Sequence, residues 1–304
     1  MGYFEQKWAY YSRLRAPDDA SVPLNFTAAE DGSTVALNKV GSPSSISLEY
    51  SLDGQTWNTY NVGTEITLAH VGDKVFFKGN NSQFSKSSSN FYKFVVTGKV
   101  LSSGNVMSLI DASCSLISIP SDYMFFGLFY GAAGLLTAPL LPATTLKSSC
   151  YAFMFCGAVD LLSGVRSLPA KTLVGACYNQ LYNGCVSLIE PSEMAANEVR
   201  GSVGGTVNVC RYMYGGCTSL VRAPVIHFAP RGDRACQYMF DGCSSLKRVA
   251  VEFSAWPTSE DGSSVIANWL RGVAASGTFV CPATLATETR SASRVPSGWT
   301  VVNF

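Results

Sequence analysis

A short phrase recurs through the second half of the chain and constrains its fold more than any other feature. It reads Cys-aromatic-x-Met-Phe-x-Gly-Cys-x-Ser-Leu and is clearest at residues 236–246. The copies share one glycine, found at Gly131, Gly157, Gly184, Gly216 and Gly242. Successive glycines are 26, 27, 32 and 26 residues apart. A period in this range, held over five copies, predicts a solenoid.

Apolar residues keep fixed positions relative to this glycine. An aromatic residue lies two positions before it, as at Phe240, and a leucine lies four positions after it, as at Leu220. Burying about five such side chains gains about 10 kcal/mol per unit. Ordering the backbone costs about 1–2 kcal/mol per residue, which is more over a whole unit. Only stacked units that cover each other's apolar faces are therefore expected to fold.

Within each unit, the spacing predicts a short helix followed by a short strand. Over residues 144–155, apolar side chains recur at three- and four-residue steps, as on one buried helix face. The glycine would end this helix. The strand after it would stop at a proline, namely Pro139, Pro191 or Pro224. Stacking would give an α/β leucine-rich repeat solenoid of short parallel strands and short helices over residues 101–255.

The repeats resemble those of the BspA-like leucine-rich repeat family, which comprises bacterial surface proteins and relatives in bacteriophages. The matching stretches are CYAFMFCGAVDLL, CYNQLYNGCVSL, CRYMYGGCTSL and CQYMFDGCSSL, with LPATTL and LPAKTL between them. The resemblance covers about residues 100–304. It implies a solenoid that binds proteins or glycans at a surface, and it carries over no catalytic residue.

The last part of the chain, residues 256–304, is expected to close the solenoid. The stretches NWLRGVAASGTF and VPSGWTVVNF resemble the end cap of such arrays. Four large aromatic residues would cover the last repeat: Trp256, Trp269, Trp299 and Phe304.

Residues 22–100 predict a small antiparallel β-sandwich, because seven short alternating runs are separated by turn signals of the Asp-Gly type. The runs are Leu24–Thr27, Thr34–Asn38, Ser47–Ser51, Thr56–Asn61, Glu65–Leu68, Lys74–Lys78 and Tyr92–Thr97. Sandwiches often bind sugars, and four aromatic residues could stack on a sugar ring: Trp57, Tyr60, Phe84 and Tyr92. The alternative is that Trp57 and Tyr60 fill the core or a strand face.

Residues 1–20 contain a high proportion of aromatic residues for a chain terminus. Phe4, Trp8 and Tyr11 would share one face of a short helix that ends at a Pro-Asp-Asp break. This face either packs on the same chain or anchors the protein to a partner or an assembly. The beginning of the chain does not read as a secretory leader. We therefore expect a virion protein or, alternatively, an exported bacterial surface protein whose leader has been removed.

The cysteines of the repeats predict buried free thiols. Eight of the ten lie in the repeats, and a cysteine that recurs at one position behaves as a small apolar residue. The alternative is a set of disulfides, as the count would suggest in a secreted chain. The Cys-x6-Cys and Cys-x7-Cys pairs do not have zinc-site spacing.

Basic residues gather in the fourth and fifth units of an otherwise nearly neutral chain. Arg222, Lys247 and Arg248 follow the repeat leucines by one or two residues, which places them on or beside the strand face. Together with Arg211, they predict a contact for an acidic glycan or protein. The alternative is a solvated charged edge. Extra residues at 197–206 explain the long third spacing, either as a tolerated loop or as part of a binding face.

The remaining features argue against several function classes. The net charge of +1 gives no overall attraction to nucleic acid, and no run approaches the ~20 apolar residues of a membrane span. His70 and His227 are the two histidines, and no triad, acid pair, phosphate loop or metal motif accompanies them. We therefore expect neither catalysis nor a cofactor.

Together, these patterns predict a non-enzymatic structural or recognition protein. The first expectation is a phage virion component, such as a fibre, decoration or receptor-binding protein, that presents the solenoid for adhesion. The alternative is an exported bacterial adhesin that binds a host protein or glycan. The expected partners are virion or cell-surface assembly proteins and a host surface ligand, and self-association stays open.

Overall fold

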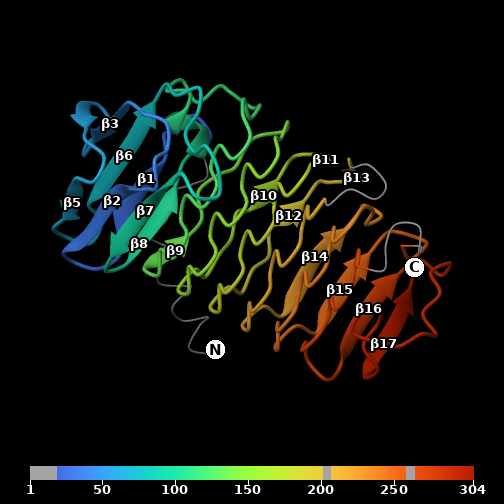
Figure 1. Cartoon of the computed structure of the whole chain (residues 1–304). Helices are drawn as coiled ribbons and strands as arrows, with labels where there is room; N and C mark the ends of the chain where they lie inside the picture. The colour runs from blue at the N-terminus through green and yellow to red at the C-terminus, as the bar shows by residue number, and fades with distance from the viewer. Residues whose placement is uncertain (1–18, 201–206, 258–263) are drawn as a thin grey trace.

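The computed structural model describes residues 19–200, 207–257 and 264–304. These residues are nearly all strand and turn, with one short 3₁₀ helix, η1 (Val106–Leu109). Sheets form the N-terminal part, and a β-solenoid of about five turns continues from them (Figure 1). The solenoid predicted from the repeats is confirmed.

Two sheets build the N-terminal part. Their strands are β1 (Asn25–Ala28), β2 (Ser33–Val40), β3 (Leu48–Ser51), β4 (Asn58–Tyr60), β5 (Glu65–Leu68), β6 (Lys74–Gly79), β7 (Phe91–Thr97) and β8 (Val100–Ser103). The orders are β4-β3-β6-β1-β8-β9, where β9 (Leu135–Thr137) is the first strand of the solenoid, and β5-β2-β7. The ring of Phe26 in β1 lies 4.8 Å from that of Phe94 in β7, so the two sheets share one core. Each of the seven expected runs is a strand, and its ends differ by at most two residues.

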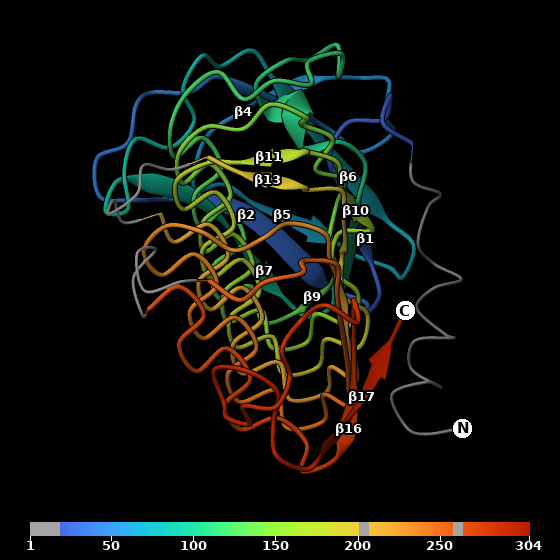
Figure 2. The ribbon, with the colours of Figure 1, turned by 90° about the vertical axis from the view of Figure 1, so that its right-hand side faces the viewer.

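The strands of the solenoid are short. They are β9 (Leu135–Thr137), β10 (Ser167–Leu168), β11 (Thr172–Leu173), β12 (Glu193–Met194), β13 (Glu198–Val199), β14 (Arg222–Ile226), β15 (Arg248–Val251), β16 (Gly277–Cys281) and β17 (Trp299–Asn303). All pairs between them are parallel. In Figure 2, β16 and β17 run along one side of the solenoid and the turns lie on the opposite side.

The N-terminal sheets cover the first end of the solenoid. β8 pairs antiparallel with β1 and parallel with β9, so the first coil extends the larger sheet. The ring of Phe94 stacks on Phe129 of the first coil at 5.6 Å, and Lys99 forms an ion pair with Asp160. The division of the chain at residue 100 stays a prediction.

The prediction of a short helix in each repeat is wrong, because the stretches before the glycines are ribbons of turns. Their backbone amides alternate between two kinds of acceptor. Met154 donates to Tyr151, three residues earlier, whereas Phe155 donates to Leu181 in the next coil at 2.9 Å. An α-helix would instead bond each amide to the carbonyl four residues earlier.

A positive φ at every fourth residue also separates this ribbon from a helix. In the second unit, φ is 55° at Ser149, 58° at Phe153 and 75° at Gly157. Such residues cannot belong to a right-handed helix. Because the turn repeats every four residues, its buried side chains also recur at three- and four-residue steps, which is the spacing that suggested a helix.

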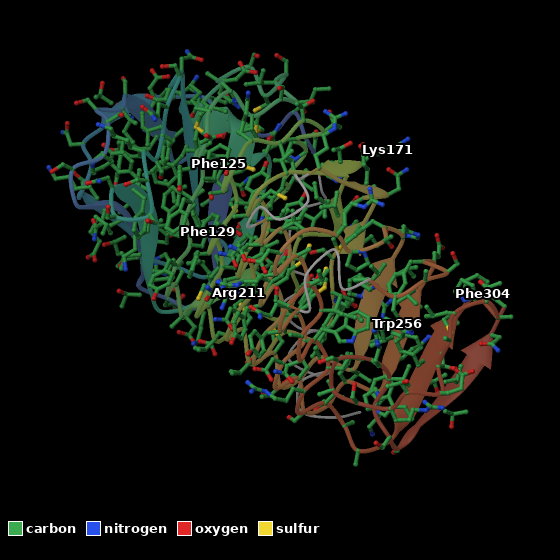
Figure 3. The ribbon with its side chains drawn as sticks, turned by 45° about the vertical axis from the view of Figure 1, so that its right-hand side comes forward. Phe125, Phe129, Lys171, Arg211, Trp256 and Phe304 are labelled. Atoms are coloured by element: carbon green, nitrogen blue, oxygen red, sulfur yellow. The ribbon has the colours of Figure 1, made fainter. Side chains whose placement is uncertain are left out.

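The aromatic residues two positions before the glycines form one buried stack along the axis. They are Phe129, Phe155, Tyr182, Tyr214 and Phe240. Neighbouring rings lie 5.2–5.5 Å apart and are tilted by at most 22°. Figure 3 shows Phe129 in the interior and Lys171 pointing away from the body. Each coil therefore buries its ring against both neighbours.

The thiols of the repeats are free and mostly buried. Those that follow the glycines donate to the preceding coil: Cys217 to the carbonyl of Tyr182 at 3.2 Å, and Cys243 to that of Tyr214 at 3.0 Å. Burial raises the pKa of the Cys243 thiol to about 12, so the thiol stays protonated. Cys156 is half-buried.

Tryptophans cover the last repeat, as expected, but Phe304 does not. Trp269 is fully buried, and its ring lies 6.3 Å from that of Phe240 and 6.2 Å from that of Trp256. Trp299 is also buried. Phe304, in contrast, is 69% exposed, because it follows the edge strand β17.

We predict that Phe240→Ala or Leu220→Ala lowers the free energy of unfolding by about 2–5 kcal/mol, because each leaves a hole inside the solenoid core. Denaturant unfolding would measure the loss. The exposed Val186 serves as a control, since Val186→Ala should change stability by less than about 0.5 kcal/mol. A shift that small in either core variant would contradict the buried position of its side chain in the solenoid core.

We also predict that Gly216→Ala costs about 1–2 kcal/mol through the backbone alone. Gly216 has φ of 70°, yet a Cβ there would lie 3.7 Å from the Cα of Gly184, which is an ordinary contact. Gly175 is the matched control, because its φ is not positive and an added Cβ meets only Ser148, at 3.5 Å. Gly175→Ala should raise stability by about 0.4–1 kcal/mol. Equal losses in thermal or chemical unfolding would contradict this account.

Candidate functional site

The strand side of the solenoid is interrupted between β12 and β14. β12 pairs with β10 and β14 with β15, and no ladder in the described residues joins β12 to β14. Prolines account for the gap, since they carry no N–H to donate. Pro191 precedes β12, and Pro224 lies inside β14, where the pairing register shifts. The expectation that Pro224 ends its strand is therefore wrong, because the strand continues to Ile226.

Two buried tyrosines supply hydrogen bonds at this interruption. The hydroxyl of Tyr182 accepts from the N–H of Val165 at 2.9 Å and lies 2.7 Å from Oγ of Ser192. The hydroxyl of Tyr214 accepts from the N–H of Ser192 at 3.2 Å. Burial raises the pKa of both tyrosines, so both hydroxyls stay protonated. These are the two tyrosines of the aromatic stack, and the other members are phenylalanines.

A groove of about 530 Å³ lies over the interruption, which is within the usual size range of ligand pockets. Its floor is made of buried small and apolar residues, including Ser163, Gly164, Val165, Ser192, Ala223 and Pro224. Its rim carries five exposed ionisable side chains: Arg166, Glu190, Glu193, Arg222 and His227. These side chains come from three successive coils, so the groove exists only in the stacked solenoid.

The rim presents both signs of charge to solvent. Nδ1 of His227 lies 2.8 Å from a carboxylate oxygen of Glu252, the residue directly after β15. Arg222 forms no ion pair within the described ranges. The groove can therefore offer donors and acceptors together, while the buried hydroxyl of Ser192 is held by Tyr182.

The structure brings together three of the four basic residues that the sequence singled out. Arg222 and Arg248 are register partners on neighbouring strands, and Lys247 comes directly before β15. Arg211 lies instead on the turn side, away from β14 (Figure 3), where its Nε donates to Gln237 at 2.9 Å.

The remaining sequence-predicted sites fall elsewhere. Phe4, Trp8 and Tyr11 lie outside the described residues, as do residues 201–206 of the long unit. In the N-terminal part, three of the four proposed sugar-stacking residues are buried in the core: Tyr60, Phe84 and Tyr92. Trp57 is half-buried, and Nζ of Lys78 lies 4.0 Å above its ring.

Glu190, Glu193 and His227 were not found from the sequence as parts of one site. His227 is more than thirty positions from either glutamate in the chain, and its place in the groove depends on how the coils stack. A signal for the interruption was nevertheless present. Tyrosine replaces phenylalanine in the aromatic column at the two units on either side of the longest spacing.

Comparison of the chain with protein families, characterised proteins and solved structures found no match. In the described part of the chain, no helix has the length and apolar character needed to cross a membrane. The same residues contain no cluster of three or more His, Cys, Asp or Glu placed to hold a metal ion.

We predict that Tyr182→Phe lowers the free energy of unfolding by about 1–3 kcal/mol, because the N–H of Val165 and the hydroxyl of Ser192 lose a buried partner. Tyr151 is the matched control, since its buried hydroxyl has no hydrogen-bond partner. Tyr151→Phe should leave stability unchanged or raise it. Chemical denaturation of both variants would measure the difference, and similar losses would show that the hydroxyl of Tyr182 has no special role.

Proposed function

We propose that the protein is a non-catalytic recognition protein whose solenoid binds a surface ligand in the groove over the β12–β14 interruption. The groove itself supports this proposal, because it combines a buried floor with a charged rim. The tyrosine hydroxyls hold the floor in place without a β-ladder. A preorganised floor lowers the ordering cost of binding.

The rim chemistry favours a ligand rich in both hydrogen-bond donors and acceptors. Arg222 can donate to a carboxylate or hydroxyl oxygen, and Glu190 and Glu193 can accept from hydroxyls or amides. A host surface glycan meets this requirement, and so does a polar segment of a surface protein.

The proposed setting is a phage virion, in which the protein would be a fibre, decoration or receptor-binding component. The resemblance of the repeats to the BspA-like leucine-rich repeat family supports this setting. An exported bacterial adhesin is the alternative. The recurring leucines support the leucine-rich repeat assignment, and the two N-terminal sheets that share a core support the sandwich assignment. Residues 1–16 are the proposed anchor, with Phe4, Trp8 and Tyr11 at the contact.

We predict that labelled protein binds to an array of bacterial surface glycans and envelope proteins without turning them over. Replacing both groove carboxylates, Glu190→Ala with Glu193→Ala, should weaken binding by about tenfold or more, because two rim acceptors are lost. The control replaces two exposed acids of the N-terminal part, Glu30→Ala with Glu65→Ala, and should bind like the wild type.

Three outcomes would contradict the proposal. They are product formation from a bound glycan, wild-type binding by the groove variant, and equal loss in the control. Mass spectrometry of purified virions tests the setting separately, since the protein should be present there if it is a virion component. Finding it only in the cell envelope fraction of its host would favour the adhesin.

A further inference from the structure

The outer face of the sheet β14-β15-β16-β17 is organised into columns that cross its strands. Register pairing aligns Arg222 with Arg248, and continues this first column to the hydroxyl residues Thr278 and Thr300. The side chains of this column are exposed or half-exposed. Neighbouring members lie about 4.8 Å apart across the sheet.

A second, apolar column runs beside the first. Val225 pairs with Ala250, Ala250 with Val280, and Val280 with Val302. Val225 is 39% exposed and Val302 is 46% exposed, so both ends of this column are open to solvent. Apolar side chains of another molecule could be buried against this row, and removing apolar surface from water is favourable.

The basic members of this face have no acidic partners. Arg222, Lys247 and Arg248 form no ion pair in the described residues, and like charges on directly paired positions repel. The acid on the same face, Glu252, is already engaged by His227 at 2.8 Å. Glu190, one coil before Arg222, comes within ion-pair distance of none of the three. The face therefore carries a net positive charge that the chain does not neutralise.

The sheet β14-β15-β16-β17 is also uncovered on its outer face. Its inner face packs on the solenoid core through Ile226, Val249 and Phe279. The other face carries the two columns and stays accessible. Figure 1 shows β14–β17 side by side at the end of the solenoid that is far from the N-terminal sheets.

We infer that the outer face of β14–β17 is a docking surface for a protein segment that presents apolar side chains flanked by carboxylates. Its carboxylates pair with Arg222, Arg248 and Lys247, and its apolar side chains pack on the valine column. This contact neutralises the unpaired basic charge and covers the open sheet at once. The surface shares Arg222 and Val225 with the groove and extends beyond it, since Lys247, Arg248, Val280 and Val302 do not line the groove.

The test uses the full chain and a synthetic peptide of alternating glutamate and leucine, with a glutamine–leucine peptide as the uncharged comparison. Fluorescence anisotropy should show binding of the acidic peptide, weakened by salt because the contact includes exposed charges. Lys247→Glu with Arg248→Glu should weaken this binding by about tenfold or more. Val302→Ser should weaken it about threefold through the apolar column.

The matched control is Lys171→Glu, an exposed basic residue of the solenoid away from this face. It should bind the acidic peptide within about twofold of the wild type, since exposed charges beyond a Debye length are screened. All variants change exposed residues, so their melting curves should match that of the wild type. Binding of the surface array in the groove should also survive Val302→Ser, because Val302 does not line the groove. This result separates the docking surface from the proposed function.

Several results would overturn the inference. One is no binding of the acidic peptide, and another is equal binding of the glutamine–leucine peptide. A third is equal loss in Lys171→Glu, which would show only an effect of net charge. Preferential binding of heparin over the acidic peptide would assign the face to a sulfated glycan instead. A wild-type dimer in solution that Arg248→Glu dissociates would assign the face to a second copy of this chain.

Discussion

Backbone hydrogen bonds between successive coils are the interaction on which the rest of the structure depends. In the turn ribbon, alternate amides have no acceptor inside their own unit and bond to the next coil, as Phe155 does to Leu181. A single unit would leave these amides unpaired as well as its aromatic ring exposed. The coils must therefore stack, and both ends need covers. The N-terminal sheets cover one end, and Trp269 with its neighbours covers the other.

The sequence predicted the solenoid and the strands well because both depend on local periodicity. The glycine period and the alternation of residues 22–100 are visible without any three-dimensional information. The choice between helix and turn ribbon was not visible, since both bury residues at three- and four-residue steps. Positive φ at residues other than glycine distinguishes the turn ribbon from a helix. Phe153 and Tyr212 have positive φ, yet phenylalanine and tyrosine are not residue types that predict this conformation.

The candidate site was predicted only in part. Arg222 and Arg248 occupy the same position in successive repeats, so their pairing followed from the period. The groove beside them did not follow from the period, because it depends on an interrupted β-ladder. A proline alone does not predict such an interruption, since Pro139 follows the end of β9 whereas Pro224 lies within β14. The two tyrosines that hold the floor of the groove were visible in the sequence as exceptions among the phenylalanines of the aromatic column. The role of their hydroxyls follows only from the structure, which shows the missing ladder between β12 and β14.

The long unit, from Gly184 to Gly216, shows that the two sides of a coil have different roles. We call them the turn wall, which is the ribbon of turns, and the strand wall, which carries the short strands. Across it the turn wall is unbroken, for Gln180 donates to Arg211, Tyr182 to Met213 and Gly184 to Gly215. The strand wall, in contrast, separates at the same place and forms the groove. One wall therefore keeps the coils aligned while the other opens. The extra residues of this unit come after β13 in the chain, because β12 and β13 keep an offset of 26 residues from their partners in β10 and β11. Such a chain can acquire extra residues between a strand and the following turn wall, without renewing the contacts that make it fold.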